Sequence, residues 1–148
     1  MMTSNRTFLL AIPLAVALGL DAVTAAPQAS PQTIWSGVYS AAQAKRGEAI
    51  SDKRCATCHN GDLAGGQDGP ALVGADVLRA WSGRTAGDLF ERIKTTMPAD
   101  APQSLSPQET ADIVSFIFSQ DKCPAGDKEL PAEMDALTQI HITPEQKR

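Results

Sequence analysis

Two cysteines three positions apart and an adjacent histidine, in the sequence Cys55-Ala56-Thr57-Cys58-His59, are the residues of this chain best suited to chemistry. Each thiol can add across one vinyl group of a haem, and the short spacing brings both sulfurs to one edge of the porphyrin. The imidazole of His59 then lies beneath the iron, for which neutral imidazole is a good ligand. The motif therefore predicts one covalently attached c-type haem, held through Cys55 and Cys58 and ligated by His59.

Two other sites use similar spacings, namely a thioredoxin-like dithiol and one half of a zinc site. The chain has three cysteines and lacks the second Cys-x-x-Cys pair that would complete a zinc site. No βαβ pattern surrounds the motif, as a redox dithiol of that kind requires. Covalent haem attachment is therefore the favoured interpretation.

The N-terminal residues have the layout of a secretory signal peptide. Met1 to Ser4 leads through Arg6 into a mostly apolar run over residues 8–20, and small residues follow as far as Ala25. The run is shorter than the roughly 18 residues of a membrane-spanning helix, so a retained anchor is the less favoured alternative. We expect cleavage after Ala25, with Ala26 as the alternative site, and a periplasmic mature protein without a stable membrane span.

Removal of residues 1–25 leaves about 120 residues, which suits a single domain. We expect a flexible lead-in over residues 26–33, a folded domain over 34–122 and a C-terminal extension over 123–148. Arg6 and Asp21 leave together, so the formal net charge stays at -4. This acidic balance argues against nucleic acid as a partner.

Hydrophobic spacing and capping residues predict three helices. Residues 41–54 are compatible with a helix that delivers Cys55 to the haem, and residues 85–95 carry apolar side chains at helical spacing. Ser106-Pro107-Gln108-Glu109 combines a hydroxyl cap, a proline at the first helical position and a carboxylate that reaches back, so a third helix begins there. Between the first two helices, glycines and prolines mark residues 60–70 as an irregular loop.

Met97 is the best candidate for a second axial ligand. It follows the 85–95 helix, precedes Pro98 and carries a thioether that binds low-spin iron well. The two N-terminal methionines leave with the signal peptide, and Met134 lies beyond the last core helix. His141, the other histidine, is expected to be a surface side chain, and bis-histidine ligation through it remains the alternative.

These motifs resemble those of the class I cytochromes c, in particular the small bacterial periplasmic monohaem kind related to the haem domains associated with quinoprotein dehydrogenases. The haem motif matches, Gly69-Pro70-Ala71-Leu72 matches the Gly-Pro-x-Leu segment, and Thr96-Met97-Pro98 matches the distal-ligand loop. The resemblance implies an all-α fold whose helices pack around one haem. It also implies that the carbonyl of Pro70 accepts a hydrogen bond from the free N–H of His59.

In the resembled family, a glycine on the first helix packs against an aromatic residue on the last, and the matching residues here are Gly47 and Phe116. Four residues before the motif, where these proteins commonly have an aromatic side chain, this chain has Ser51. Either Phe118 or Tyr39 fills that place, or the helix interface is less well packed.

Three further features leave alternatives open. Cys123 has no intramolecular partner, so it is either a buried, inert thiol, which is favoured, or a link between two chains under oxidising conditions. Trp81 and Arg84 are either a packed indole and an ordinary surface arginine or contacts of the haem propionates. The segment 123–142 is either a docking arm or a tail wrapped over its own domain.

Together these features predict a periplasmic one-electron carrier and not an enzyme. With His59 and Met97 on the two axial positions, the iron has no open site for substrate, and electrons pass through the haem edge near the thioethers. The resemblance suggests a quinoprotein dehydrogenase as donor and a terminal oxidase as acceptor. The alternatives are a gas sensor or weak peroxidase with a labile Met97, and a fixed electron-transfer subunit of a dehydrogenase complex.

Overall fold

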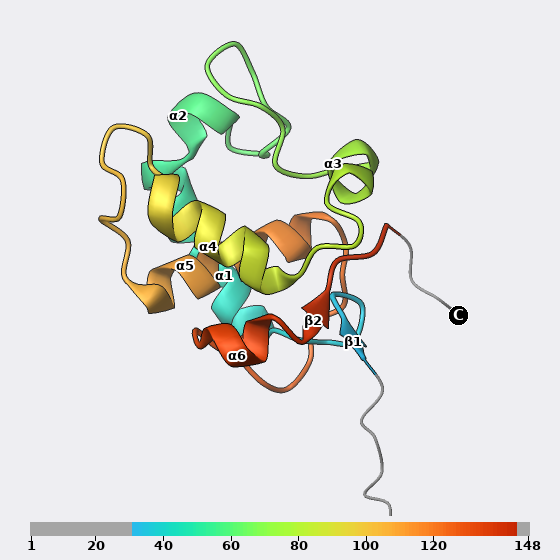
Figure 1. Cartoon of the computed structure of the whole chain (residues 1–148). Coiled ribbons are helices and arrows are strands. Elements are labelled where there is room, and N and C mark those ends of the chain that lie inside the picture. The colour runs from blue at the N-terminus through green and yellow to red at the C-terminus, as the bar shows by residue number, and fades with distance from the viewer. Residues whose placement is uncertain (1–30, 145–148) are drawn as a thin grey trace, which may run out of the picture.

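The chain folds into helices with one small sheet in the computed structural model, which describes residues 31–144 (Figure 1). In chain order the elements are β1 (Gln32–Thr33), α1 (Ala41–Arg54), α2 (Ala56–His59), α3 (Ala75–Ala80), α4 (Ala86–Thr96), α5 (Pro107–Gln120), α6 (Met134–Leu137) and β2 (Ile140–His141). The all-α class is confirmed, because β1 and β2 have only two residues each. The predicted signal peptide lies outside the described residues.

The three long helices are α1, α4 and α5, and they begin and end close to where the sequence predicts. The Thr85 hydroxyl accepts from the backbone N–H of Asp88, whose carboxylate accepts from Thr85 in return. Ser106 and Glu109 form the same reciprocal capping box at the start of α5. Each box satisfies N–H groups that have no partner within the helix, which explains why α4 and α5 begin at these residues.

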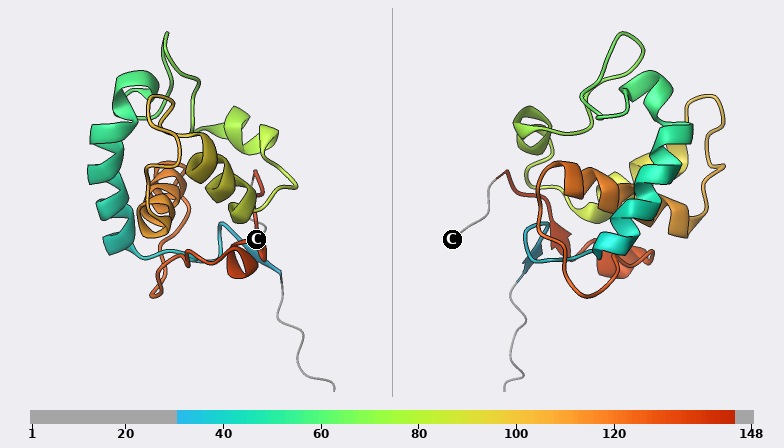
Figure 2. Two further views of the ribbon diagram at one scale, coloured as in Figure 1. Left: turned by 60° about the vertical axis from the view of Figure 1, so that its left-hand side comes forward. Right: turned by 180° about the vertical axis from the view of Figure 1, so that it is seen from behind.

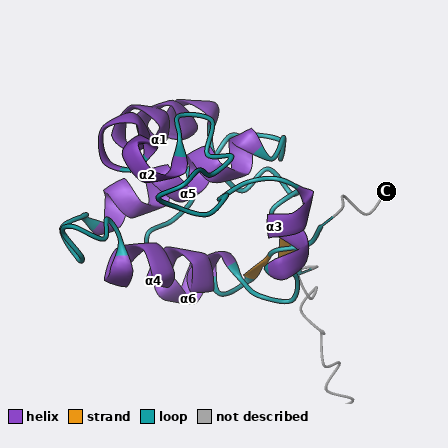
Figure 3. Cartoon of the chain, turned by 90° about the horizontal axis from the view of Figure 1, so that it is seen from above, coloured by secondary structure: helices purple, strands orange, loops and turns teal. Residues whose placement is uncertain are grey.

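Helix α5 lies between α1 and α4 (Figures 2 and 3). Gly47, on α1, permits the close contact between α1 and α5 because it has no Cβ. A Cβ placed there would lie 1.9 Å from the carbonyl oxygen of Asp112 and 3.0 Å from the backbone nitrogen of Ile113. The close packing of Gly47 on the last helix is thus as predicted, but its nearest neighbours are backbone atoms one turn before Phe116. Packing of Gly47 against the Phe116 ring itself stays a prediction.

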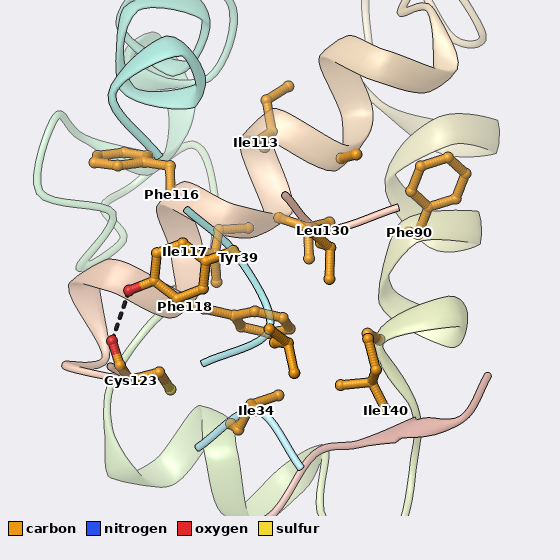
Figure 4. Packing of buried hydrophobic residues seen from close by; sticks show 14 of the residues in the cluster. Ile34, Tyr39, Phe90, Ile113, Phe116, Ile117, Phe118, Cys123, Leu130 and Ile140 are labelled. Atoms are coloured by element: carbon orange, nitrogen blue, oxygen red, sulfur yellow. Dashed lines mark hydrogen bonds between the residues drawn. The ribbon is translucent and has the colours of Figure 1, made fainter. Parts of the chain in front are cut away.

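Neither aromatic residue proposed to compensate for Ser51 lies at its place. Ser51 is buried in the last turn of α1, whereas Tyr39 precedes the first turn of that helix. The Tyr39 hydroxyl donates a 2.6 Å hydrogen bond to the carbonyl oxygen of Cys123, and Phe118 lies beside this pair (Figure 4). About 15 Å of helix separates Ser51 from the start of α1 beside this cluster, given a rise of about 1.5 Å per residue.

The C-terminal segment packs on its own domain, so the structure shows the wrapped tail and not a free arm. Its apolar side chains Leu130, Leu137, Ile140 and Ile142 are all buried. Strand β2 pairs in parallel with β1, so the last two residues of the predicted lead-in form regular structure. The tail therefore completes the core on the side of the molecule away from α2 (Figure 1).

The side-chain amide of Gln43 joins α1 to this tail. It donates from Nε2 to the carbonyl of Leu130 at 3.0 Å and accepts at Oε1 from the Leu130 N–H at 2.6 Å. Gln43 and Leu130 are both almost fully buried. Both backbone groups of Leu130 are therefore satisfied without water, by one side chain in place of a neighbouring strand.

Candidate cofactor site

The two thiols and the imidazole of the motif come together at the single turn of α2, which Cys55 precedes as the N-cap residue. The N–H of Cys58 donates to the carbonyl of Cys55 at 3.1 Å, and the N–H of His59 donates to the same carbonyl at 2.9 Å. Cys58 is exposed, Cys55 is half-buried and His59 is buried. Burial also raises the pKa of the Cys55 thiol above its usual value.

The loop after α2 holds the ring of His59 by one hydrogen bond. Nδ1 lies 2.7 Å from the carbonyl oxygen of Pro70. A carbonyl oxygen only accepts, so Nδ1 carries a proton, and in the neutral ring the lone pair is on Nε2. Within residues 31–144, Nε2 has no hydrogen-bond partner. This neutral tautomer, oriented by a backbone carbonyl, is the form in which histidine ligates a metal.

Gly69 makes the approach of Pro70 to the imidazole sterically feasible. A Cβ at Gly69 would lie 2.9 Å from Nδ1 of His59 and 2.9 Å from the carbonyl oxygen of Cys58. Any side chain there would displace either the ring or the loop, which makes Gly69 part of the site. In the sequence, Gly69 was noted only as the first residue of the Gly-Pro-x-Leu segment. Its position directly before Pro70 was the signal that could have identified it as a residue of the site.

Met97 ends α4 and is half-buried against the hydrophobic core. The loop that follows it lies on the same side of the molecule as α2 (Figures 1 and 2). A hydrogen bond of 2.6 Å from Nη2 of Arg54 to the hydroxyl of Ser104 ties this loop to the residue that precedes the motif. Arg54 and Ser104 were not singled out from the sequence, because nothing local relates two residues 50 positions apart.

The other candidate residues lie elsewhere or make contacts of their own. His141 is exposed on β2, and its backbone carbonyl accepts from the N–H of Ile34 at 3.0 Å. The guanidinium of Arg84 lies 5.3 Å from the centre of the Trp81 ring, a cation–π contact. Cys123 is buried, and burial raises the pKa of its thiol to about 12, as the inert alternative requires.

The donor set fits a covalently attached haem better than a bound metal ion. One imidazole nitrogen is free and two thiols occupy the same turn, which is the set that thioether attachment needs. Among the residues that the structure describes, no three His, Cys, Asp or Glu side chains gather into a metal-binding group.

In the same part of the chain, no helix is long and apolar enough to cross a membrane.

One family model matches this chain, and one solved structure is similar to it. The model of the family described as "Cytochrome C oxidase, cbb3-type, subunit III" matches residues 42–117, just over half of the chain. No curated protein gives a significant match to the sequence. Among solved structures, the chain is similar to one in the sulfane dehydrogenase SoxCD from Paracoccus pantotrophus, with 18% identity and a TM-score of 0.49. That match covers 81% of this chain and 68% of the other.

Neither description names a quinoprotein dehydrogenase, so the link to that class stays a prediction. The family is one of c-type cytochromes, whose members carry covalently bound haem c and transfer electrons. The matched residues 42–117 include almost all of α1, the Cys-x-x-Cys-His motif and most of α5. The chain therefore belongs to the cbb3-type cytochrome c oxidase subunit III family and is a class I cytochrome c.

Proposed function

We propose that this protein is a periplasmic one-electron carrier that holds one haem c through Cys55 and Cys58, with His59 and Met97 as the axial ligands. The observation that carries the proposal is the 2.7 Å contact between His59 Nδ1 and the carbonyl of Pro70. This contact orients the ring, selects the tautomer and increases the basicity of the free Nε2. When bound, the haem supplies an iron centre that cycles between the ferrous and ferric states.

The burial of the motif residues supports electron exchange at one edge of the cofactor. His59 is buried, so the chain excludes water from the proximal side, whereas Cys58 is exposed. A partner protein can therefore approach the Cys58 side without any rearrangement of the fold. Such redox encounters usually use small, transient interfaces.

Several partly buried apolar side chains support the presence of a large apolar group. They are only partly buried, although they pack against the core, and they come from α1, the loop after α2, the end of α3 and α4: Ile50, Leu72, Val73, Trp81, Leu89 and Met97. Apolar surface of this kind gains free energy when a flat apolar ring covers it, at about 25 cal/mol per Å². A covalently held porphyrin would provide that cover.

Export and partners are part of the same proposal. The apolar run over residues 8–20 and the small residues up to Ala25 support cleavage of a signal peptide and a periplasmic location. A dehydrogenase, of the quinoprotein class by the resemblance, would reduce the protein. A terminal oxidase would accept its electrons, and the family description, which names an oxidase subunit, supports this part.

The visible spectrum of the exported protein tests the proposal, oxidised and reduced, with carbon monoxide added to the reduced sample. We expect low-spin bands, a sulfur-to-iron charge-transfer band in the ferric state and no response to carbon monoxide. Met97→Ala should abolish the charge-transfer band. Met134→Ala is the matched control, because Met134 is 39% exposed on α6 and should leave the spectrum unchanged.

Two results would contradict the proposal. A high-spin spectrum, or ready binding of carbon monoxide, would mean an open iron and would favour the gas sensor or peroxidase alternative. A charge-transfer band that survives Met97→Ala would show that Met97 is not the ligand.

A further inference from the structure

The side chain of Asn60, directly after His59, forms a hydrogen bond inside the loop that carries Pro70. Asn60 has φ 62° and ψ 160°, a backbone conformation that residues other than glycine rarely adopt. Its amide Nδ2 donates a hydrogen bond of 2.6 Å to the carbonyl oxygen of Gly65. The N–H of Gly65 in turn donates to the carbonyl of His59 at 3.0 Å. The backbone N–H of Gly65 is therefore bonded to His59, and its carbonyl oxygen is bonded to Asn60.

Gly65 lies directly against the peptide group that contacts the imidazole. A Cβ at Gly65 would be 2.7 Å from the carbonyl carbon of Pro70 and 2.4 Å from the nitrogen of Ala71. With φ at +82°, Gly65 has a backbone conformation that side chains rarely adopt. Its place in the loop thus determines how closely the Pro70 carbonyl can approach His59.

Two more backbone bonds close the loop around this contact. The N–H of Gly66 donates to the carbonyl of Gly69 at 2.9 Å, and the N–H of Leu72 donates to the carbonyl of Leu63 at 2.9 Å. They hold the two sides of the loop together, but neither reaches the residues of α2. In the described structure, the Asn60 amide adds a side-chain link from the end of α2 to this part of the loop, beside the bond of the His59 ring to Pro70.

We propose that Asn60 is a positioning residue for the proximal histidine, acting through Gly65 and the carbonyl of Pro70. The inference rests on the proposed function, in which Nε2 of His59 ligates the haem iron. A firmly held carbonyl at Nδ1 makes the imidazole a stronger donor, which favours ferric over ferrous iron. Loss of the Asn60 amide should loosen this carbonyl and raise the reduction potential.

The test uses haem-loaded protein and the variant Asn60→Gly, which keeps the positive φ accessible and removes only the amide. We expect an upward shift of the reduction potential and about fivefold faster solvent exchange of the His59 Nδ1 proton, measured by NMR, since one net hydrogen bond contributes about 1 kcal/mol. Asn60→Asp is the second variant, because it keeps the size and backbone tolerance of asparagine but cannot donate. It should accelerate the same exchange.

Asp62→Ala is the control. The Asp62 carboxylate accepts from the N–H of Ala64 at 3.0 Å, so it shapes the same loop without contacting Gly65 or Pro70. If Asn60→Gly leaves potential and exchange unchanged, Asn60 is only a turn residue. If Asp62→Ala shifts both equally, the effect is general loosening of the loop, and the inference is overturned.

Failure of the proposed function would look different from failure of this inference. In that case the parent protein itself would lack a low-spin haem spectrum, before any variant is compared. A normal parent spectrum with an unchanged Asn60→Gly potential would refute the inference alone.

Discussion

Gly47→Ala tests the packing of α1 on α5. The added Cβ would lie 1.9 Å from the carbonyl oxygen of Asp112 and 2.5 Å from its carbonyl carbon. Both are backbone atoms in the middle of a buried helix, so no side chain can rotate away to make room. The two helices must instead separate locally by about 1 Å, which disturbs every contact along their interface.

The cost follows from two opposing effects. Overpacking of a well-packed core destabilises by about 1–3 kcal/mol, and contact with backbone belongs at the upper end. Alanine is favoured over glycine inside a helix by about 1 kcal/mol, which offsets part of this cost. We therefore expect a net loss of about 2 kcal/mol, equivalent to a melting temperature about 8 °C lower for a domain of this size.

Thermal unfolding of the haem-loaded protein, followed by circular dichroism, measures this loss. Gly61→Ala is the matched control, because a Cβ at Gly61 meets nothing within 4 Å. We expect it to unfold like the parent. If Gly47→Ala melts within about 2 °C of both, the helices have more room than the structure gives them, and the reasoning fails.

Three further predictions concern the ion pair, the tail and the third cysteine. Arg46 forms two hydrogen bonds with the buried carboxylate of Asp112. Arg46→Ala should therefore lower the free energy of unfolding, measured in urea, by about 2 kcal/mol, and an unchanged urea midpoint would contradict this. Gln43→Leu leaves the buried N–H and carbonyl of Leu130 without partners. It should lower the free energy of unfolding by about 2–4 kcal/mol and speed hydrogen exchange of the Leu130 amide, and an unchanged exchange rate would refute this prediction. The thiol of Cys123 has its ordinary pKa of 9.0 in the unfolded chain and a pKa of about 12 in the folded one, so its contribution to stability persists below pH 9 and is lost towards pH 12. Cys123→Ala should weaken that alkaline loss, and identical pH profiles of the two proteins would rule out the thiol as its cause.

The helix ends were predictable from the sequence because their signals act over a few residues. The Ser106 hydroxyl and the Glu109 carboxylate serve each other across one turn, so their spacing is visible in the sequence. The short helices α2, α3 and α6 were not predicted, since four to six residues carry too little periodicity. The β1–β2 pair was missed for a related reason, because its strands are more than 100 positions apart.

The candidate site divides in the same way. Cys55, Cys58 and His59 were evident from spacing alone, since the attachment chemistry itself requires it. The hydrogen bond of Pro70 was expected only through the resemblance to cytochromes c. The contact of Gly69 with the imidazole depends on how the whole loop folds back, and no local pattern predicts that.

By itself, the sequence determined the motif that can hold a haem, the helix that leads to it and the capped starts of α4 and α5. Each of these depends on bonds between residues that are close in the chain. Only the tertiary structure decided that Gly47 meets the backbone of Asp112 and that Gln43 holds Leu130, 87 positions away. Contacts of this kind depend on the packing of the entire core, so the free energy that selects them is not local to any segment.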